Sequence, residues 1–363
     1  MDKSFYFDYV QKYFPQLVLS IVERINGQRV GQLPYLYRTL LTPRFTADTR
    51  WASVLAEYTR VAADVVELSS ELPLKSRDTI ETAHGDIPKI GMKLALGEKE
   101  MKDIDAMLAQ PNLFGLNQVI QTMFNDVPRV IEGVYERIED IFLSELSTGV
   151  GLSSNNDGKG VRVDVGYYAA NQFTSTTPWA SSTAVDAEVD IQQVYDKAIE
   201  DNNSITDVYA DDTALHALYK NDKMRGLYAF DQGFAGALSN VPVLDLQKLQ
   251  TLFRTKWNTE LHRVYRKTKT EINGKKQNHS AWQKGMMTFV CDSQLGTLVY
   301  TNCAEQTRPV AGVTYQMADD FILASRYSTN DPLQEITASQ AMVVPIINNV
   351  DRIYTLDTTV TKG

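Results

Sequence analysis

Cysteine and histidine are scarce in this chain of 363 residues, which contains two of the first and four of the second. Two cysteines, Cys291 and Cys303, are too few for the framework of bridges that holds small secreted folds together, and the sequence leaves open whether they pair. The histidines lie far apart, and none has a zinc-ligand spacing to a cysteine or to another histidine. We therefore expect no metal site, and a reducing, intracellular place of assembly.

Long apolar runs and a basic excess are also missing. No window approaches the roughly 20 uninterrupted apolar residues that cross a bilayer. The apolar stretch Phe14–Val22 is short, follows Asp8 and lacks a small-residue cleavage site, so it does not resemble a signal peptide. The net charge of −9 argues against a dedicated nucleic-acid-binding protein. These absences predict a protein without a membrane segment.

The sequence contains none of the common catalytic motifs. It has no G-x-S-x-G elbow, no dinucleotide fingerprint after a strand and no phosphate loop. Scattered carboxylates could supply an acid–base pair, but the sequence selects none of them. We therefore expect no catalytic residue and no cofactor, with an enzyme that uses an unrecognised site as an alternative.

The strongest periodic signal runs from Leu116 to Leu146, where apolar residues recur every three or four positions. This pattern predicts a long one-sided helix over residues 116–147 that a sheet or a partner must cover. Pro128 lies within the stripe. Either it kinks one helix, or Asn125 or Asp126 caps a second helix that has Pro128 in its first turn.

Two segments before this helix predict an arm and an extended hairpin. Residues 1–22 mix aromatic and apolar side chains, and Pro15 interrupts their helical stripe, which fits either a docking arm or a plain helix followed by a loop. Strand patterns at Tyr58–Leu68 and Ile90–Leu96 flank a polar stretch. They predict a hairpin with too little apolar surface to be stable alone.

The later segments mix helices and strands. Residues 170–182 predict a loop, 191–199 and 249–264 predict helices, and 288–299 and 342–360 are rich in β-forming residues. Since βαβ repetition is absent, the predicted fold class is α+β.

A basic cluster lies at residues 263–276. It contains Arg263, Arg266, Lys267, Lys269, Lys275 and Lys276. The first four are candidates for weak contact with DNA. The alternatives are a solvated surface, or a partner for the acidic stretch Asp186–Asp212, which holds nine acids and one lysine.

Five stretches follow one another from about Leu40 to the C-terminus. They are Thr42-Pro43-Arg44-Phe45 with Asp48-Thr49; Ala62–Glu98 with Leu72-Pro73-Leu74-Lys75-Ser76-Arg77 and Asp86-Ile87-Pro88-Lys89-Ile90; the helix end Phe142–Gly149 followed by Val161-Arg162-Val163-Asp164-Val165-Gly166; Trp179 before the acidic run Asp186–Asp190; and Tyr327–Pro332 leading to Val343-Val344-Pro345 and Arg352–Leu356. In this order and spacing the chain resembles the major capsid proteins of tailed bacteriophages, of the lambda head-protein type.

The resemblance implies the tailed-phage major capsid fold, which is shared with encapsulins. Its parts map to an N-terminal arm at residues 1–58, an E-loop hairpin at 59–100 and an axial domain at 186–342. A peripheral domain at 101–185 contains the spine helix, residues 116–147, and is completed by the C-terminal strand at 343–363.

The implied function is that of a major capsid protein, which self-assembles into hexamers and pentamers of an icosahedral head around double-stranded viral DNA. An acidic chain suits a wall that must not bind DNA tightly or sequence-specifically, because strong phosphate contacts would hinder packaging. The implied location is the virion, after assembly in the host cytoplasm. An encapsulin-like nanocompartment shell is the related alternative.

The resemblance also implies partners and contact residues. Because Met1 lies close to the arm, it implies a separate scaffolding protein, together with a portal and optionally a decoration protein. No isopeptide pair is recognisable, so covalent cross-linking is not predicted. The arm and the E-loop are expected to bury apolar side chains on adjacent subunits. The expected contact residues are Phe5, Phe7, Tyr13, Met92, Leu94 and Leu96.

Overall fold

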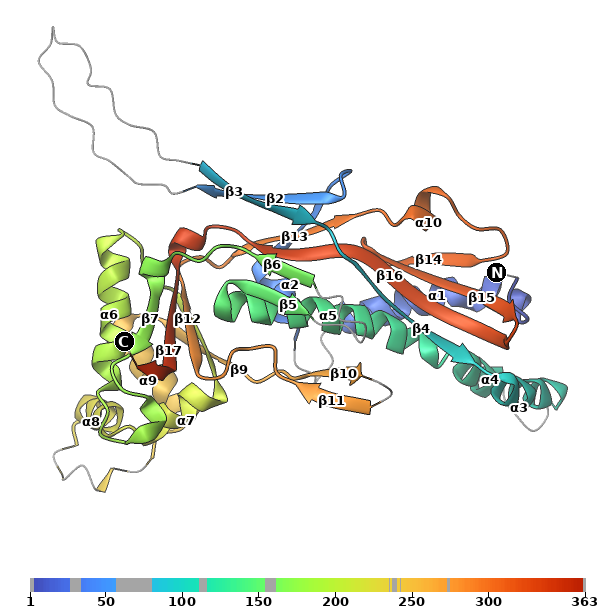
Figure 1. Ribbon diagram of the computed structural model, residues 1–363. Coiled ribbons are helices and arrows are strands. Elements are labelled where there is room, and N and C mark those ends of the chain that lie inside the picture. The colour runs from blue at the N-terminus through green and yellow to red at the C-terminus, as the bar shows by residue number, and fades with distance from the viewer. Residues whose placement is uncertain are drawn as a thin grey trace, which may run out of the picture. The chain divides into compact units, whose positions relative to one another are not determined.

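The computed structural model describes residues 3–26, 34–56, 80–110, 116–153, 161–234, 236, 240–241, 243–272 and 275–361. The chain forms two compact units. Unit 1 contains Met1–Trp51, Asp86–Asp140 and Leu298–Pro345, and unit 2 contains Ala52–Gly85, Ile141–Thr297 and Ile346–Gly363. Helices and strands are interspersed in both units, so the predicted α+β class is confirmed (Figure 1).

The centre of unit 1 is a six-stranded sheet in the order β1-β13-β16-β15-β14, with β4 paired to β16. The strands are β1 (Leu41–Phe45), β4 (Lys89–Leu96), β13 (Gly296–Thr301), β14 (Thr314–Ala318), β15 (Ile322–Asn330) and β16 (Leu333–Ile347). The hairpin of β15 and β16 pairs from Leu323 opposite Gln340 to Asn330 opposite Leu333. Strand β4 is antiparallel to β16.

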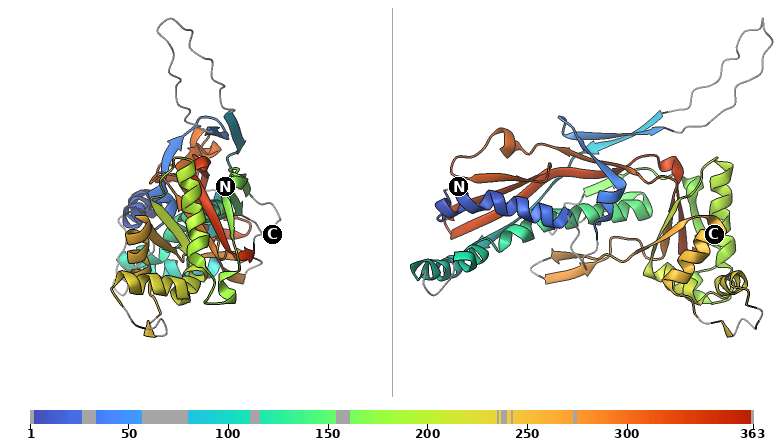
Figure 2. Two further views of the ribbon diagram at one scale, coloured as in Figure 1. Left: turned by 90° about the vertical axis from the view of Figure 1, so that its left-hand side faces the viewer. Right: turned by 180° about the vertical axis from the view of Figure 1, so that it is seen from behind.

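Helix α1 (Phe7–Asn26) runs without a break through Pro15, although the sequence predicts that this residue interrupts it. Proline removes one backbone hydrogen bond from a helix. Here that cost is offset because Val10, Phe14 and Val18 are fully buried along one face of the helix. The Phe14 ring stacks on that of Phe124, with centroids 6.5 Å apart, so the middle of α1 contacts the turn at Phe124. Figure 2 shows α1 from behind.

The long helix predicted over residues 116–147 is two helices, α4 (Leu116–Met123) and α5 (Asp126–Thr148). Pro128 lies in the first turn of α5, where its missing N–H leaves no hydrogen bond unmade. Of the two alternatives that the sequence leaves open, the second is therefore confirmed. Helices α2 (Leu36–Leu40), α3 (Glu98–Ala109) and α10 (Ala304–Thr307) complete unit 1.

A two-stranded hairpin is present, but its strands differ from the predicted pair. Strand β2 (Arg50–Ala56) pairs with β3 (Ile80–Asp86). Residues 57–79, which include the predicted strand Tyr58–Leu68, lie outside the described residues. The other predicted strand, Ile90–Leu96, belongs to β4, which pairs with β16 in the six-stranded sheet instead.

Unit 2 is built on a five-stranded sheet in the order β7-β17-β12-β8-β9. Its strands are β7 (Gln172–Ser175), β8 (Asp207–Asp211), β9 (Glu260–Val264), β12 (Met286–Val290) and β17 (Ile353–Thr361). Strand β7 corrects the loop predicted over residues 170–182: it pairs in parallel with β17, so a partner distant in sequence overrides the local Ser/Thr-rich composition.

Four helices cover one face of this sheet. They are α6 (Ala187–Glu200), α7 (Asp212–Lys220), α8 (Asp222–Asp231) and α9 (Leu246–Trp257). Because strand side chains alternate, Met287 and Phe289 enter the core beneath these helices, while Thr288 turns away and donates to the Leu146 carbonyl at 3.0 Å. The ring of Tyr195 stacks on that of Trp257 at 5.4 Å in the same core. The helices predicted at 191–199 and in the first part of 249–264 are confirmed.

Two small ladders and two free thiols complete the description. Strands β5 (Val150–Ser153) and β6 (Val161–Asp164) pair with each other, as do β10 (Thr268–Ile272) and β11 (Lys275–His279). Cys291 and Cys303 are buried and free, and burial raises the pKa of the Cys291 thiol to about 12. Within the described ranges, no helix could cross a membrane, and no three potential ligands gather around a metal position.

Candidate assembly surfaces

The N-terminal residues are anchored on the sheet of unit 1 before α1 begins. The Ser4 hydroxyl donates to the Glu335 carboxylate, and the Phe5 N–H donates to the other oxygen of that carboxylate at 3.2 Å. The Ser328 hydroxyl donates to the Lys3 carbonyl at 2.7 Å. Residues 3–5 are therefore hydrogen-bonded to both strands of the β15–β16 hairpin.

The anchor point is an ion pair that is buried completely. Arg326 on β15 and Glu335 on β16 both have fully buried side chains, and Arg326 Nε lies 2.9 Å from Glu335 Oε1. Arg326 Nη1 also donates to the Met123 carbonyl at the end of α4 at 2.9 Å, and the guanidinium lies 4.6 Å from the centroid of the Phe124 ring. One arginine thus connects the sheet, the α4–α5 junction and, through Glu335, the N-terminal residues.

The sequence interpretation missed this pair, although a signal existed. Ile322, Ala324 and Arg326 are alternate residues of one strand, so an arginine shares a face with buried apolar side chains. An arginine at such a position needs a buried acid, because an unpaired buried charge is very costly.

The three expected arm contacts are only partly covered by their own chain. Phe5 is 50% exposed, and Phe7 and Tyr13 are half-buried. The Tyr13 ring stacks on that of Tyr9, with centroids 6.4 Å apart, and Lys3 Nζ lies 3.4 Å from the Phe7 centroid. The arm therefore keeps an aromatic surface that its own chain covers only in part.

The three expected E-loop contacts all lie on β4, which pairs with β16 of the same chain. Leu94 is opposite Thr337 and Leu96 opposite Glu335. Met92 stays 37% exposed, and its sulfur passes so close to Gly133 of α5 that a Cβ there would be 2.2 Å from it. These side chains already contact their own chain, so any contact with a neighbour would use their remaining exposed surface.

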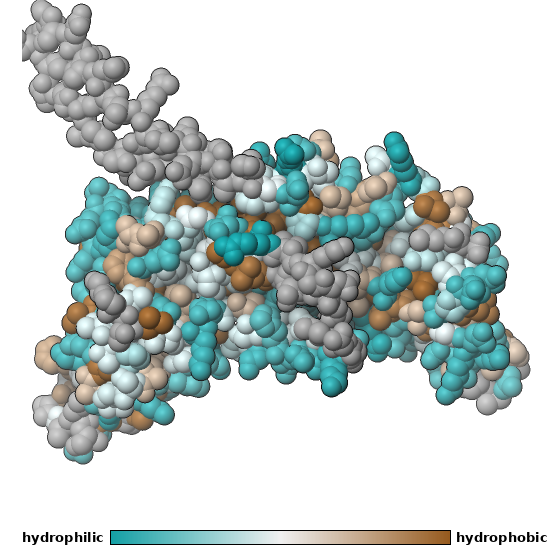
Figure 3. Space-filling view, in the orientation of Figure 1, coloured by the Kyte–Doolittle hydropathy of each residue, from teal (hydrophilic) through white to brown (hydrophobic). Residues whose placement is uncertain are grey.

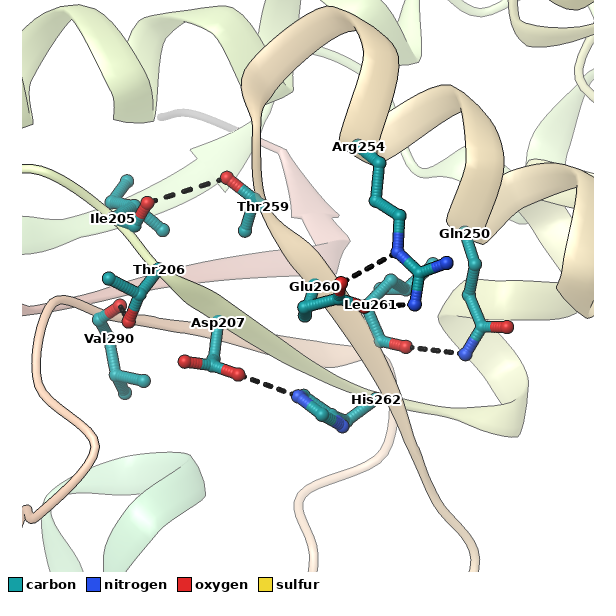
Figure 4. A network of polar contacts seen from close by, with 10 residues as sticks. All are labelled: Ile205, Thr206, Asp207, Gln250, Arg254, Thr259, Glu260, Leu261, His262 and Val290. Atoms are coloured by element: carbon teal, nitrogen blue, oxygen red, sulfur yellow. Dashed lines mark hydrogen bonds and ion pairs between the residues drawn. The ribbon is translucent and has the colours of Figure 1, made fainter.

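The side chains of the basic cluster differ in whether a carboxylate pairs with them. Arg263 Nε and Nη2 donate to the two oxygens of the Asp212 carboxylate, at 2.5 and 3.0 Å, and these bonds lower the pKa of Asp212. The same edge of unit 2 carries the Arg254–Glu260 and His262–Asp207 pairs (Figure 4). Lys267 and Lys269 lie beyond it and have no carboxylate within ion-pair distance in the described part of the chain. The four expected DNA-facing residues are therefore not equivalent.

A buried carboxylate also lies near the end of α5, in unit 2. Glu145 Oε1 accepts a hydrogen bond from the Ile347 N–H at 2.7 Å, whereas Oε2 has no partner among the described residues. Burial raises the pKa of Glu145 well above its ordinary value, although the bond from Ile347 opposes the shift. The folded chain therefore favours the protonated acid.

This architecture is the tailed-phage major capsid fold. The structure is similar to a solved protein assigned as the capsid protein of a prophage of Escherichia coli CFT073, with a TM-score of 0.58 and 13% identity over 94% of this chain and 98% of that one. A phage-related protein of Bordetella bronchiseptica RB50 has a TM-score of 0.49 and 11% identity over 94% and 96%. The capsid protein of myovirus XM1 has a TM-score of 0.46 and 12% identity over 91% and 92%.

The likeness lies in the fold rather than in the sequence. No family model matches the chain, and a search of curated proteins finds no match. The prophage protein nevertheless aligns over nearly the full length of both chains, so the fold implied by the resemblance is confirmed.

We predict that Glu335→Gln destabilises unit 1 by about 3–5 kcal/mol, because it leaves the Arg326 charge buried without a counter-charge. Urea unfolding of the unassembled chain, followed by circular dichroism, measures this. The double variant Arg326→Met/Glu335→Gln, which removes both charges, should recover much of the loss. The exposed pair supplies the control, since Glu260→Gln should change stability far less. Equal effects at Glu335 and Glu260 would contradict the assignment.

A second prediction concerns pH. Because the folded pKa of Glu145 exceeds the unfolded one, the folded state binds the proton more tightly, and the wild type loses stability as pH rises from the ordinary glutamate range towards the raised value. Glu145→Gln cannot ionise and should lack this loss. The midpoint of thermal unfolding, measured from pH 5 to pH 9, should therefore shift in favour of the variant as pH rises. Parallel curves for the two proteins would show that Glu145 does not titrate in this way.

Proposed function

We propose that this chain is the major capsid protein of a tailed bacteriophage and assembles into the hexamers and pentamers of an icosahedral head. The observation that carries the proposal is the fold, which the prophage capsid protein shares over 94% of this chain and 98% of its own. A shell subunit needs surfaces for its neighbours rather than a reaction centre, and the partly covered arm and the separate β2–β3 hairpin fit that need.

The same physics supports contacts between copies. A two-stranded hairpin and an aromatic arm gain stability when a neighbour buries them, so assembly offsets the cost of keeping them exposed. Contacts of this kind join different surfaces on the two copies, and such head-to-tail contacts close into rings. Many modest contacts then add to a strong shell.

The implied partners follow from this role. Scaffolding protein would guide assembly in the host cytoplasm, a portal would occupy one vertex, and a decoration protein could bind the finished virion. Packed double-stranded DNA would face an acidic wall, whose net charge of −9 limits adhesion. An encapsulin-like compartment would share the fold but enclose protein cargo instead.

Electron microscopy of the purified chain, alone and with a candidate scaffolding protein, tests the proposal. We expect uniform icosahedral shells, or rings and tubes built from the same contacts. A neighbouring cargo-enzyme gene, with shells that package that enzyme, would favour the nanocompartment. A chain that stays monomeric under every condition would count against any shell function.

The arm prediction can be tested at Phe5, the most exposed of the six expected contacts. Phe5→Asp should reduce shell yield strongly while leaving the unfolding midpoint of the unassembled chain unchanged, because half of this side chain is already in water. Val310→Asp, at a residue of unit 1 that is 44% exposed and outside the arm, is the control. If the Phe5 variant assembled normally, the arm would not be part of the interface between subunits. In the same way, normal assembly of Leu94→Asp would show that the E-loop is not part of it.

A further inference from the structure

The hairpin of β10 and β11 is isolated within unit 2. Its strands pair only with each other, from Thr268 opposite His279 to Ile272 opposite Lys275. All described residues of β11 are exposed. In β10, Thr268 is buried, whereas Lys269 and Glu271 on the other face are exposed. A two-stranded hairpin with an uncovered face is marginally stable in water. Such a hairpin gains stability if another surface covers it.

The hairpin is also the basic part of an acidic chain. Residues 266–279 contain five cationic side chains and one carboxylate, a net charge of +4 against −9 for the whole chain. Lys267, Lys269, Lys275 and Lys276 have no carboxylate within ion-pair distance in the described ranges. The space-filling view shows hydrophilic surface where the hairpin lies (Figure 3). These four lysines are therefore available to bind an acidic partner.

The charge pattern of the hairpin favours a protein over DNA as its binding partner. Residues opposite each other in an antiparallel pair share a face, so the pairs Lys269–Asn278 and Glu271–Lys276 lie on one face of the hairpin. Glu271 lies opposite Lys276, so this face carries charges of both signs, whereas a phosphate backbone offers only negative charge. Residues 268–279 contain no Phe, Tyr or Trp on which a base could stack. A mixed face of this kind matches a protein surface that combines acids with other groups.

The outer face of α6 has the complementary character. Asp196 and Glu200 are exposed, and neither has a cation within ion-pair distance among the residues described. Val189 and Ile199 are 56% and 68% exposed on the same side of the helix. The other acids of α6 and its two ends that are not fully buried are already paired. These pairs are Asp186–Lys223, Glu188–Lys256 and Asp201–Lys197.

The hairpin and α6 lie on opposite sides of the five-stranded sheet of unit 2 (Figures 1 and 2). Two complementary surfaces on opposite sides of one unit cannot satisfy each other within a single copy. Placed on successive copies, they form a head-to-tail contact, which repeats around a ring.

We propose that the β10–β11 hairpin of one copy docks on the outer face of α6 of a second copy, with Lys269 and Lys276 against Asp196 and Glu200. This proposal rests on the proposed function, since it names one contact within the ring of subunits. The apolar surfaces of Val189 and Ile199 lose water in the same contact.

Charge reversal on each side, and then on both, tests the contact. Lys269→Glu/Lys276→Glu and Asp196→Lys/Glu200→Lys should each raise the protein concentration needed for assembly by at least about tenfold, the equivalent of about 1.4 kcal/mol, because like charges then face each other. The combined four-residue variant restores opposite charges and should assemble near the wild-type concentration. Lys99→Glu/Lys102→Glu on α3 is the matched control for net charge.

The outcomes separate this contact from the proposed function. If the wild type does not assemble, the proposed function fails and the contact fails with it. If the wild type and the hairpin variant assemble alike, the contact is wrong and the shell function stands. Loss in both double variants without rescue in the combined variant also rejects the contact.

Retention of the unassembled chain on duplex DNA at increasing salt tests the competing partner. Retention that the hairpin reversal abolishes, with assembly unchanged, would assign Lys267, Lys269 and their neighbours to DNA instead. The docking proposal expects the wild type and the hairpin variant to show equally weak retention.

Discussion

The buried ion pair of Arg326 and Glu335 is the constraint on which unit 1 depends. Both charges are removed from water, so each is tolerable only while the other stays in place. Arg326 Nη1 also binds the end of α4, and the Glu335 carboxylate accepts hydrogen bonds from the residues that precede α1. The pair therefore fixes the register of the β15–β16 hairpin, the start of the long helix and the path of the N-terminal arm at one point.

This arrangement explains how a chain can carry surfaces that it does not cover. A docked N-terminus holds α1 so that Val10, Phe14 and Val18 are buried, while Phe7 and Tyr13 stay half-buried. In the same way, the sheet of unit 2 is fixed by its helix-covered core, while β10 and β11 lie outside it. Repeated contacts between identical copies need a rigid core and exposed extensions. Both units have this combination.

Much of the fold could be predicted because its patterns are local. The apolar stripe of α5 and the periodicity of α6 are visible in windows of a few turns. The continuity of α1 through Pro15 could not be predicted, because it depends on the burial of Phe14 against a helix a hundred residues later. The partner of residues 90–96 escaped prediction for the same reason, since β16 lies more than two hundred residues away. The candidate contact residues were predicted from a resemblance, and the structure adds how much of each its own chain leaves exposed.

The central claim is that copies of this chain close into a shell. Charge-detection mass spectrometry of the purified assemblies tests it directly, because each subunit contributes 40.8 kDa. A closed shell predicts one or a few discrete particle masses, each corresponding to a fixed number of subunits allowed by icosahedral symmetry. A continuous spread of masses, or only the 40.8 kDa monomer at every concentration and with scaffolding protein present, would contradict the account.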